Sequence, residues 1–361
     1  MSVKRSTFVP HEELIAACSL AAALAPRLAD RVDAVRRTGS CQAAMRALGL
    51  SPSRDRARDR LRALRDQGFE ALCLTHPDYP RLLRVTPDPP LVLSVWGRLL
   101  PEDSLAIAIV GSRRATRYGL EMSRHLASGL AASGLTIVSG LARGIDAAAH
   151  EGALRAGGRT VAVLGSGLLN VYPREHRKLA EAVAEHGAVL SELDLDASPL
   201  PGNFPRRNRI ITGMTLGTLI VEAALKSGSL VSARLALEQD REVFAVPGPA
   251  RSENSAGVHA LLRDGAALVT RSADVLEELR PEIRTLLENR RERPTESPGP
   301  ELPPVDRAIL TELATALDVD TLLERVEVPT HEALAALSRL ELQGRIWRLP
   351  GGLYQARPCK G

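Results

Sequence analysis

The stretch Leu105–Gly119, LAIAIVGSRRATRYG, decides the fold expected for this chain of 361 residues. An apolar run typical of a buried strand ends at Gly111, and a polar loop with Ser112, Arg113 and Arg114 follows it. Glycine lets backbone N–H groups face a ligand, the next helix offers its positive end, and arginine adds a bidentate fork. The stretch therefore predicts a phosphate-binding loop between a strand and a helix.

The same pattern recurs downstream. Three further apolar runs end in polar glycine loops, namely Ile137–Gly140 before Arg143-Gly144-Ile145-Asp146, Val161–Gly165 before Ser166-Gly167, and Leu219–Leu225 before Lys226-Ser227-Gly228-Ser229. Because the carboxyl ends of parallel strands meet at one edge of a sheet, several anion-facing loops are expected to share that edge.

Regular spacing of the apolar runs predicts the fold class. Segments with a helical pattern separate the runs, which begin near Leu105, Leu135, Thr160, Ala188, Leu216, Glu242 and Ala267. Continuous apolar strands with crossover helices require cover on both faces of a parallel sheet. The expectation is an α/β protein with a Rossmann-like, doubly wound parallel sheet.

Different patterns flank the sheet region. Short helical patterns over residues 12–24, 27–37, 40–48 and 54–67 predict a small N-terminal helical domain, and residues 72–100 read as a linking stretch. Three helical segments and a hairpin turning at Pro350-Gly351-Gly352 suggest a C-terminal winged helix. The expected domains are a helical domain of SAM or helix-hairpin-helix type (1–70), the sheet domain (71–280), a proline-bearing linker (281–304) and the winged helix (305–361).

Composition favours a soluble cytoplasmic protein. Hydrophobic residues make up 44% of the chain, no run is long enough for a membrane span, and the start MSVKRSTFVPHEEL lacks an apolar signal core. Cys18, Cys41, Cys73 and Cys359 show neither disulfide nor metal-ligand spacing. The net charge of +4 permits a nucleic-acid partner without demanding one.

Six ordered motifs resemble the DNA-processing protein A (DprA/Smf) family over roughly residues 70–275. They are IVGSRRATRYG, IVSGLARGIDAAAHEGAL, VAVLGSGLLNVYP, FPRRNRIITGMT, VEAALKSGSLVSARLALEQDREVFAVPG and SAGVHALLRDGAALV. The resemblance implies a protein that binds single-stranded DNA and loads the recombinase RecA onto it during natural transformation and homologous recombination. It implies neither catalysis nor a cofactor.

Arg113 and Lys226 are the strongest candidate DNA contacts, because each matches a family position that contacts backbone phosphates. Phe204 could stack a base or be buried, and Arg143 and Asp146 could instead pair with each other to close their loop. The full set expected to bind nucleic acid is Gly111, Ser112, Arg113, Arg114, Arg143, Phe204, Arg206, Asn208, Arg209, Lys226, Ser227, Gly228 and Ser229.

The resemblance also implies a homodimer formed through the late part of the sheet domain. The matching positions are His259, Leu262 and Leu268. Many relatives have Asn where this chain has His259, so the polar contacts of that interface stay open. Leu262 and Leu268 could also simply pack on their own sheet.

An enzymatic alternative rests on three carboxylate or imidazole side chains. Asp146 and His150 stand four residues apart, and Glu222 follows an apolar run, so acid–base or metal chemistry is conceivable. The stretch Gly213–Thr218 followed by Glu222 faintly resembles Rossmann-like phosphoribohydrolases, nucleotide N-glycosidases in which such a glutamate serves the ribose. The Pro-Gly-Gly start of that group's phosphate loop is missing here. Binding of a nicotinamide cofactor is disfavoured as well, because no Gly-x-Gly-x-x-Gly follows the first strand.

Overall fold

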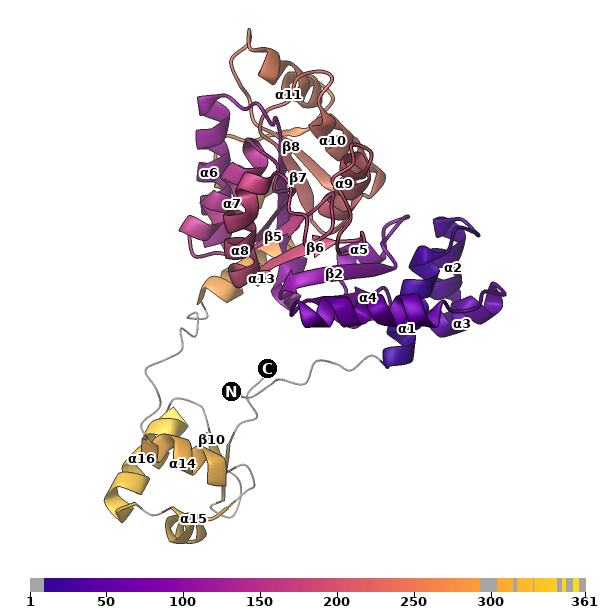
Figure 1. Ribbon diagram of the computed structural model, residues 1–361. Helices are drawn as coiled ribbons and strands as arrows, with labels where there is room; N and C mark the ends of the chain where they lie inside the picture. Colours follow the sequence, from indigo (N-terminus) through magenta and orange to yellow (C-terminus); the bar gives the residue numbers. More distant parts are fainter. Residues whose placement is uncertain are drawn as a thin grey trace. The chain divides into compact units, whose positions relative to one another are not determined.

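The predicted apolar runs form the parallel part of a nine-stranded sheet (Figure 1). A computed structural model describes residues 10–292, 304–313, 317–326, 328–342, 346–348 and 353–356, in two units divided after Glu292. The parallel strands are β3 (Ala106–Val110), β4 (Thr136–Ser139), β5 (Thr160–Val163), β6 (Ala188–Ser191), β7 (Gly217–Ile220), β8 (Glu242–Ala245) and β9 (Ala267–Leu268). The doubly wound parallel sheet is thereby confirmed.

Strand β3 shows why both faces of the sheet are covered. Ala106 and Ala108 belong to one apolar cluster, while Ile107 and Ile109 belong to another, and all four are fully buried. Alternation with a period of two sends successive side chains to opposite faces. Helices α6 (Arg117–Ala132) and α7 (Ile145–Arg155) contribute to the isoleucine cluster, and α9 (Asn203–Gly213) and α10 (Gly228–Glu238) to the alanine cluster.

The strand order places a crevice beside β3. The order is β1-β2-β6-β5-β4-β3-β7-β8-β9, so β3 lies between β4 and β7. The connections that follow β3 and β7 therefore run away from each other. Such a divergence opens a crevice at the carboxyl ends of the two strands, and ligands of doubly wound proteins bind there.

The stretch predicted as a link, residues 72–100, belongs to the sheet instead. Strands β1 (Glu70–Cys73) and β2 (Val92–Gly97) pair antiparallel with each other, and β2 pairs antiparallel with β6. Between them, Tyr79 is fully buried and donates its hydroxyl to the carbonyl of Pro90 at 2.7 Å. Short strands that pair antiparallel at an edge do not repeat the strand-helix spacing, and the sequence pattern therefore missed them.

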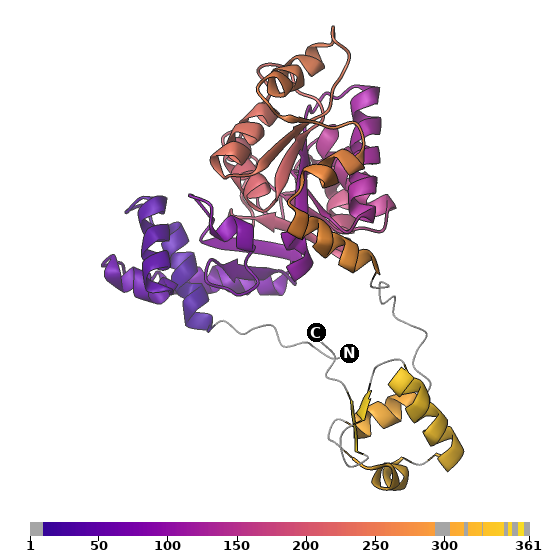
Figure 2. The same ribbon diagram turned by 180° about the vertical axis from the view of Figure 1, so that it is seen from behind.

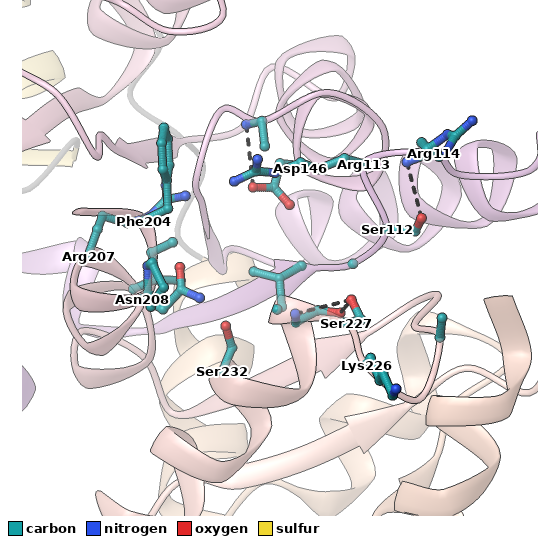
Figure 3. A pocket seen from close by; sticks show the side chains of 18 of the residues that line it. Ser112, Arg113, Arg114, Asp146, Phe204, Arg207, Asn208, Lys226, Ser227 and Ser232 are labelled. Carbon is teal, nitrogen blue, oxygen red and sulfur yellow. Dashed lines mark hydrogen bonds between the residues drawn. The ribbon is translucent and has the colours of Figure 1, made fainter. Parts of the chain in front are cut away.

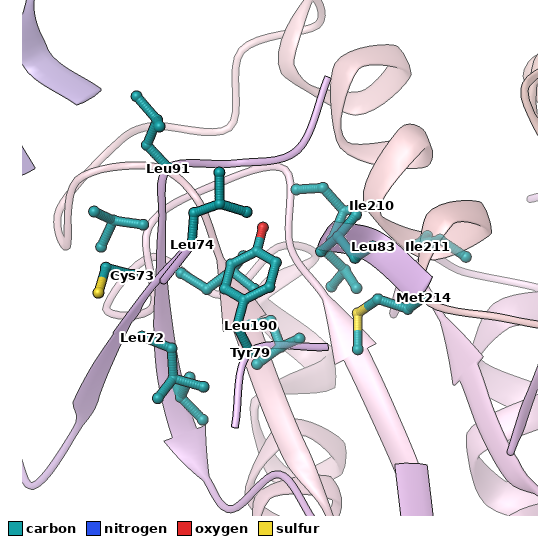
Figure 4. Packing of buried hydrophobic residues seen from close by; sticks show 14 of the residues in the cluster. Leu72, Cys73, Leu74, Tyr79, Leu83, Leu91, Leu190, Ile210, Ile211 and Met214 are labelled. Carbon is teal, nitrogen blue, oxygen red and sulfur yellow. The ribbon is translucent and has the colours of Figure 1, made fainter. Parts of the chain in front are cut away.

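The N-terminal helices lie beside this edge of the sheet (Figure 2) and share a core with it. Figure 4 shows the part of this core around Leu72, Tyr79 and Leu190. They are α1 (His11–Ala22), α2 (Leu28–Thr38), α3 (Cys41–Ala47) and α4 (Arg54–Asp66). Ile15 and Val32 lie in the same apolar cluster as Leu72 and Leu93 of β1 and β2. Residue 70, the expected domain boundary, is the first residue of β1, and the helices before it belong to the same unit as the sheet.

The first part of the expected linker is a helix. Residues 281–292 form helix α13 (Pro281–Glu292), and its Leu287 is buried in the isoleucine cluster with Ile283 packed against it. Two apolar side chains four residues apart lie on one helix face, which explains why this polar stretch is ordered on the sheet domain.

The C-terminal unit has its own core. Helices α14 (Pro304–Glu312), α15 (Val319–Arg325) and α16 (Thr330–Leu342) bury Ile309, Leu322 and Leu337, and strands β10 (Ile346–Arg348) and β11 (Tyr354–Ala356) pair antiparallel. The turn predicted at residues 350–352 lies outside the described residues. No helix in the described part of the chain has the length and apolarity to cross a membrane.

Glu13 of α1 links this helix to the start of α3 and to the residues that follow β1. Its carboxylate accepts hydrogen bonds from the N–H of Cys41 and from the hydroxyls of Ser40 and Thr75, at 2.9 and 3.0 Å for the hydroxyls. Burial works against the charge of Glu13, but these bonds outweigh it and hold the pKa of the carboxyl below its ordinary value of 4.5.

Replacing Glu13 by Gln is therefore expected to lower the free energy of unfolding by about 1–3 kcal/mol at neutral pH. A depressed native pKa stabilises the fold above the unfolded-state pKa, and this stability is lost as the pH falls through the native value. Urea denaturation at neutral pH and at about pH 3.5 should show the gap between wild type and Glu13→Gln closing in acid. An equal gap at both pH values would contradict this role.

Candidate nucleic-acid interface

A cavity of about 1020 Å³ occupies the crevice between the ends of β3 and β7 (Figure 3). Its wall combines the loop after β3, the start of α9 and the loop that leads into α10. Ten of the thirteen residues predicted to bind nucleic acid line it, namely Gly111, Ser112, Arg113, Arg114, Phe204, Asn208, Lys226, Ser227, Gly228 and Ser229. The structure thus brings most of the predicted set together.

The loop after β3 can take its course only with glycine at position 111. A Cβ there would lie 2.7 Å from Cγ1 of Ile145 and 2.9 Å from the carbonyl oxygen of Glu222. The next residue, Ser112, donates its N–H to that same carbonyl at 2.8 Å. The loop carrying Arg113 is therefore fixed to the end of β7.

The carboxylate of Glu222 holds the far end of this loop. Its side chain is buried, and its carboxylate accepts bonds from the N–H of Thr116 at 2.9 Å and from the Thr116 hydroxyl. Thr116 in turn caps α6 by accepting the N–H of Gly119 at 3.1 Å. Glu222 does not line the cavity, so its carboxylate holds the helix start rather than facing a ribose there.

The amino end of α10 opens into the cavity on the other side. Ser227 is its N-cap and accepts the N–H of Ser229 at 3.3 Å, while its hydroxyl also bonds that of Ser229 at 2.7 Å. A Cβ at Gly228 would meet nothing within 4 Å, so the backbone here is open to a ligand. Free N–H groups and the helix dipole at such an end attract anions, and exposed Lys226 precedes them.

Arg113 reaches across the cavity toward Phe204 (Figure 3). Its guanidinium carbon lies 4.9 Å from the centre of the Phe204 ring, a cation–π contact that orients the planar group. The Phe204 ring also lies 5.7 Å from that of Tyr172. Phe204 is half-buried. The sequence left Phe204 open between base stacking and burial, and in the structure one neighbour of the ring is the Arg113 guanidinium.

Two buried side chains of opposite charge also line the cavity and interact electrostatically with Arg113. They are Arg207, which is 4% exposed, and Asp146, which is 6% exposed. Burial lowers the pKa of Arg207 to about 10, against the attraction of Asp146. Burial likewise raises the pKa of Asp146 above its ordinary value, against the attraction of Arg207. Sequence reasoning missed Arg207, although it stands within the quoted motif FPRRNR.

Three predicted arginines lie outside the cavity lining, and each has a carboxylate partner. Arg143 pairs with Glu175 at 2.6 Å, and Arg206 pairs with Glu192 at 3.2 Å. Arg209 is buried between Glu192 at 2.7 Å and Asp88 at 2.9 Å. Burial opposes the charge of Arg209, but its two carboxylates outweigh it and raise the pKa above the ordinary value.

The alternative of an ion pair between Arg143 and Asp146 is wrong, since Arg143 bonds Glu175. Asp146 instead accepts the N–H of Ala142 at 3.4 Å. His150 bonds the hydroxyl of Thr160 through Nδ1 at 2.7 Å, and burial lowers its pKa to about 3. His150 is therefore a neutral, buried side chain of α7. The described residues contain no group of three or more His, Cys, Asp or Glu side chains that could hold a metal ion.

The residues expected at a dimer interface lie on α11 (Glu253–Arg263) and β9, at one end of the sheet. His259 bonds the carbonyl of Gly248 through Nε2 at 3.0 Å, and Leu262 packs partly against the core. Leu268 is 55% exposed on the terminal strand. Of the three, Leu268 offers the free apolar surface.

The different surroundings of Arg209 and Arg113 predict different costs of removal. Arg209→Ala leaves the buried carboxylate of Glu192 with less compensation and should lower the free energy of unfolding by about 3–5 kcal/mol. Arg113→Ala removes an exposed side chain and should change it by no more than about 0.5 kcal/mol. Urea denaturation of both variants measures this, and equal losses would contradict the assignment of Arg209 to the fold.

Comparison with known proteins agrees with this geometry. A family model described as DNA recombination-mediator protein A matches residues 70–280, and a model of the DprA winged helix domain matches residues 293–352. The protein Smf of Escherichia coli is 46% identical over 291 residues, which cover 77% of this chain and 75% of that protein. The DNA processing protein DprA of Bacillus subtilis is 41% identical over 220 residues, 61% of this chain and 74% of that protein.

Solved structures of this kind are also similar. The X-ray structure of DprA from Streptococcus pneumoniae matches with a TM-score of 0.58 and 36% identity, over 71% of this chain and 88% of that one. A structure of DNA processing protein A from Helicobacter pylori, described as giving insights into its single-stranded DNA binding mode, matches with a TM-score of 0.53 and 33% identity. The match covers 61% of this chain and 96% of that one. The C-terminal winged helix is confirmed, and the chain belongs to the DNA recombination-mediator protein A (DprA) family.

Proposed function

We propose that this chain binds single-stranded DNA in the cavity at the ends of β3 and β7. The observation that carries the proposal is the joint placement of Arg113, Lys226 and the open start of α10 around one cavity. Among the described residues, neither Arg113 nor Lys226 has a carboxylate within ion-pair distance, whereas the predicted arginines outside the cavity do. Cations without a carboxylate partner are free to bind phosphates.

The shape of the site favours a single strand over a duplex. The cationic and N–H-rich groups surround a concave space, and a flexible strand can bend its phosphates into it while a stiff duplex cannot. The residues proposed to contact DNA are Gly111, Ser112, Arg113, Arg114, Asn208, Lys226, Ser227, Gly228 and Ser229. Arg143 and Arg206 are exposed and could add phosphate contacts by exchanging their carboxylate partners.

Membership of the family and the single-stranded DNA named for the Helicobacter pylori relative support a DNA-processing role. The proposal extends to the cytoplasmic handover of the strand to RecA in natural transformation. It also includes a homodimer through Leu262 and Leu268, which would bring two cavities onto one strand and raise the effective concentration of the second.

Arg113→Ala and Lys226→Ala are each expected to weaken single-stranded DNA binding roughly tenfold at low salt, because a charge-assisted bond is lost. Each should also reduce the slope of log K against log salt by about 0.7, the contribution of one phosphate contact. Fluorescence anisotropy of a labelled oligonucleotide over a salt series, single-stranded and duplex in parallel, measures both quantities.

Two exposed cations outside the cavity serve as controls. Arg234 on α10 pairs with Glu238, and Lys178 is an exposed lysine on α8 (Arg177–His186). Arg234→Ala and Lys178→Ala should leave affinity and slope unchanged. Binding that is absent in wild type, or indifferent to Arg113 and Lys226, would contradict the proposal and direct attention to hydrolysis of nucleoside monophosphates.

A further inference from the structure

Tyr172 is an exposed aromatic ring on the wall of the cavity. It lines the cavity together with Pro199 and Pro201, and 39% of it is exposed. Tyrosines elsewhere in the fold use their hydroxyls, since Tyr79 bonds Pro90 and Tyr118 bonds Pro247, each at 2.7 Å. No hydrogen bond of the Tyr172 hydroxyl is found in the described part of the chain. The fold therefore does not account for this side chain through its polar group.

Phe204, the other aromatic residue of the cavity lining, is already covered by its neighbours. Arg113 lies over the ring at 4.9 Å, and Tyr172 lies against it at 5.7 Å with an angle of 55° between the rings. The backbone at Gly165 also approaches so closely that a Cβ there would lie 2.8 Å from Cδ1 of Phe204. A base on the Arg113 side would have to displace the guanidinium that is needed for phosphate.

We propose that Tyr172 is the platform on which a base of the bound strand stacks. The inference rests on the proposed binding of single-stranded DNA and names a contact to the bases rather than to the backbone. Strands that bind without sequence preference combine a cationic track with aromatic side chains, because every base presents a π-face. Phe204 and Arg113 serve the phosphates in this arrangement, and Tyr172 serves the bases.

The position of Tyr172 suits this division. It lies on the cavity wall formed with Pro199, Pro201 and Phe204, and the Arg113 guanidinium is held over the Phe204 ring. A phosphate at Arg113 therefore leaves an adjoining base close to an exposed ring. Pro199 and Pro201 extend the apolar wall on which that base would lie.

The test compares two labelled strands of equal length in the full chain. One is oligo(dT), and the other has the same phosphates but carries abasic sites throughout. Tyr172→Ala should weaken oligo(dT) binding about tenfold while leaving the abasic strand and the salt slope unchanged. Tyr172→Phe keeps the ring and should bind oligo(dT) like wild type. Tyr118→Ala, which removes a ring with 38% exposure outside the cavity, serves as the matched control and should bind both strands like wild type.

Two results would overturn the inference while leaving the proposed function intact. Equal losses for the two strands, together with a smaller salt slope, would show that Tyr172 only supports Phe204 and Arg113. Unchanged binding of oligo(dT) by Tyr172→Ala would show that the ring does not touch the strand. Failure of the wild type to bind either strand would instead overturn the proposed function itself, and the inference with it.

Discussion

The close approach of two strand ends at Gly111 is the constraint on which the site depends. The N–H of Ser112 bonds the carbonyl of Glu222 at 2.8 Å, and there is no room for a side chain at position 111. This contact joins the loop after β3 to the end of β7, from which the loop to α10 departs. It therefore holds Arg113 and Lys226, which are more than 100 residues apart in the sequence, on the rim of one cavity.

Charge around the cavity divides into a paired and an unpaired set. Arg143, Arg206 and Arg209 each bond a carboxylate, and Arg207 is buried beside Asp146. Arg113 interacts electrostatically with both Asp146 and Arg207, and its guanidinium lies over the face of the Phe204 ring. Holding a guanidinium on a ring leaves its N–H groups free, and such preorganisation reduces the entropy that phosphate binding would cost.

The sequence predicted the parallel strands and ten of the residues that line the cavity, because glycine loops after buried strands have a local pattern. It did not predict β1 and β2, because β2 joins the sheet by pairing antiparallel with β6, far along the chain, and β1 then pairs with β2. It also could not separate Arg207 and Arg209 from Arg206 and Asn208, which adjoin them in FPRRNR. On helix α9, Arg207 lines the cavity, whereas Arg209 pairs with Glu192 and Asp88. Only the tertiary packing of the helix decides which of these side chains faces the cavity.

The central claim is that one strand of DNA binds the loops held together at Gly111. Hydrogen–deuterium exchange of the full chain, with and without oligo(dT), tests it most directly. The account predicts slower exchange in residues 111–116 and 224–230 on binding, with α4 unchanged. Slower exchange confined to α4 or to the C-terminal unit, with these two loops unaffected, would contradict it.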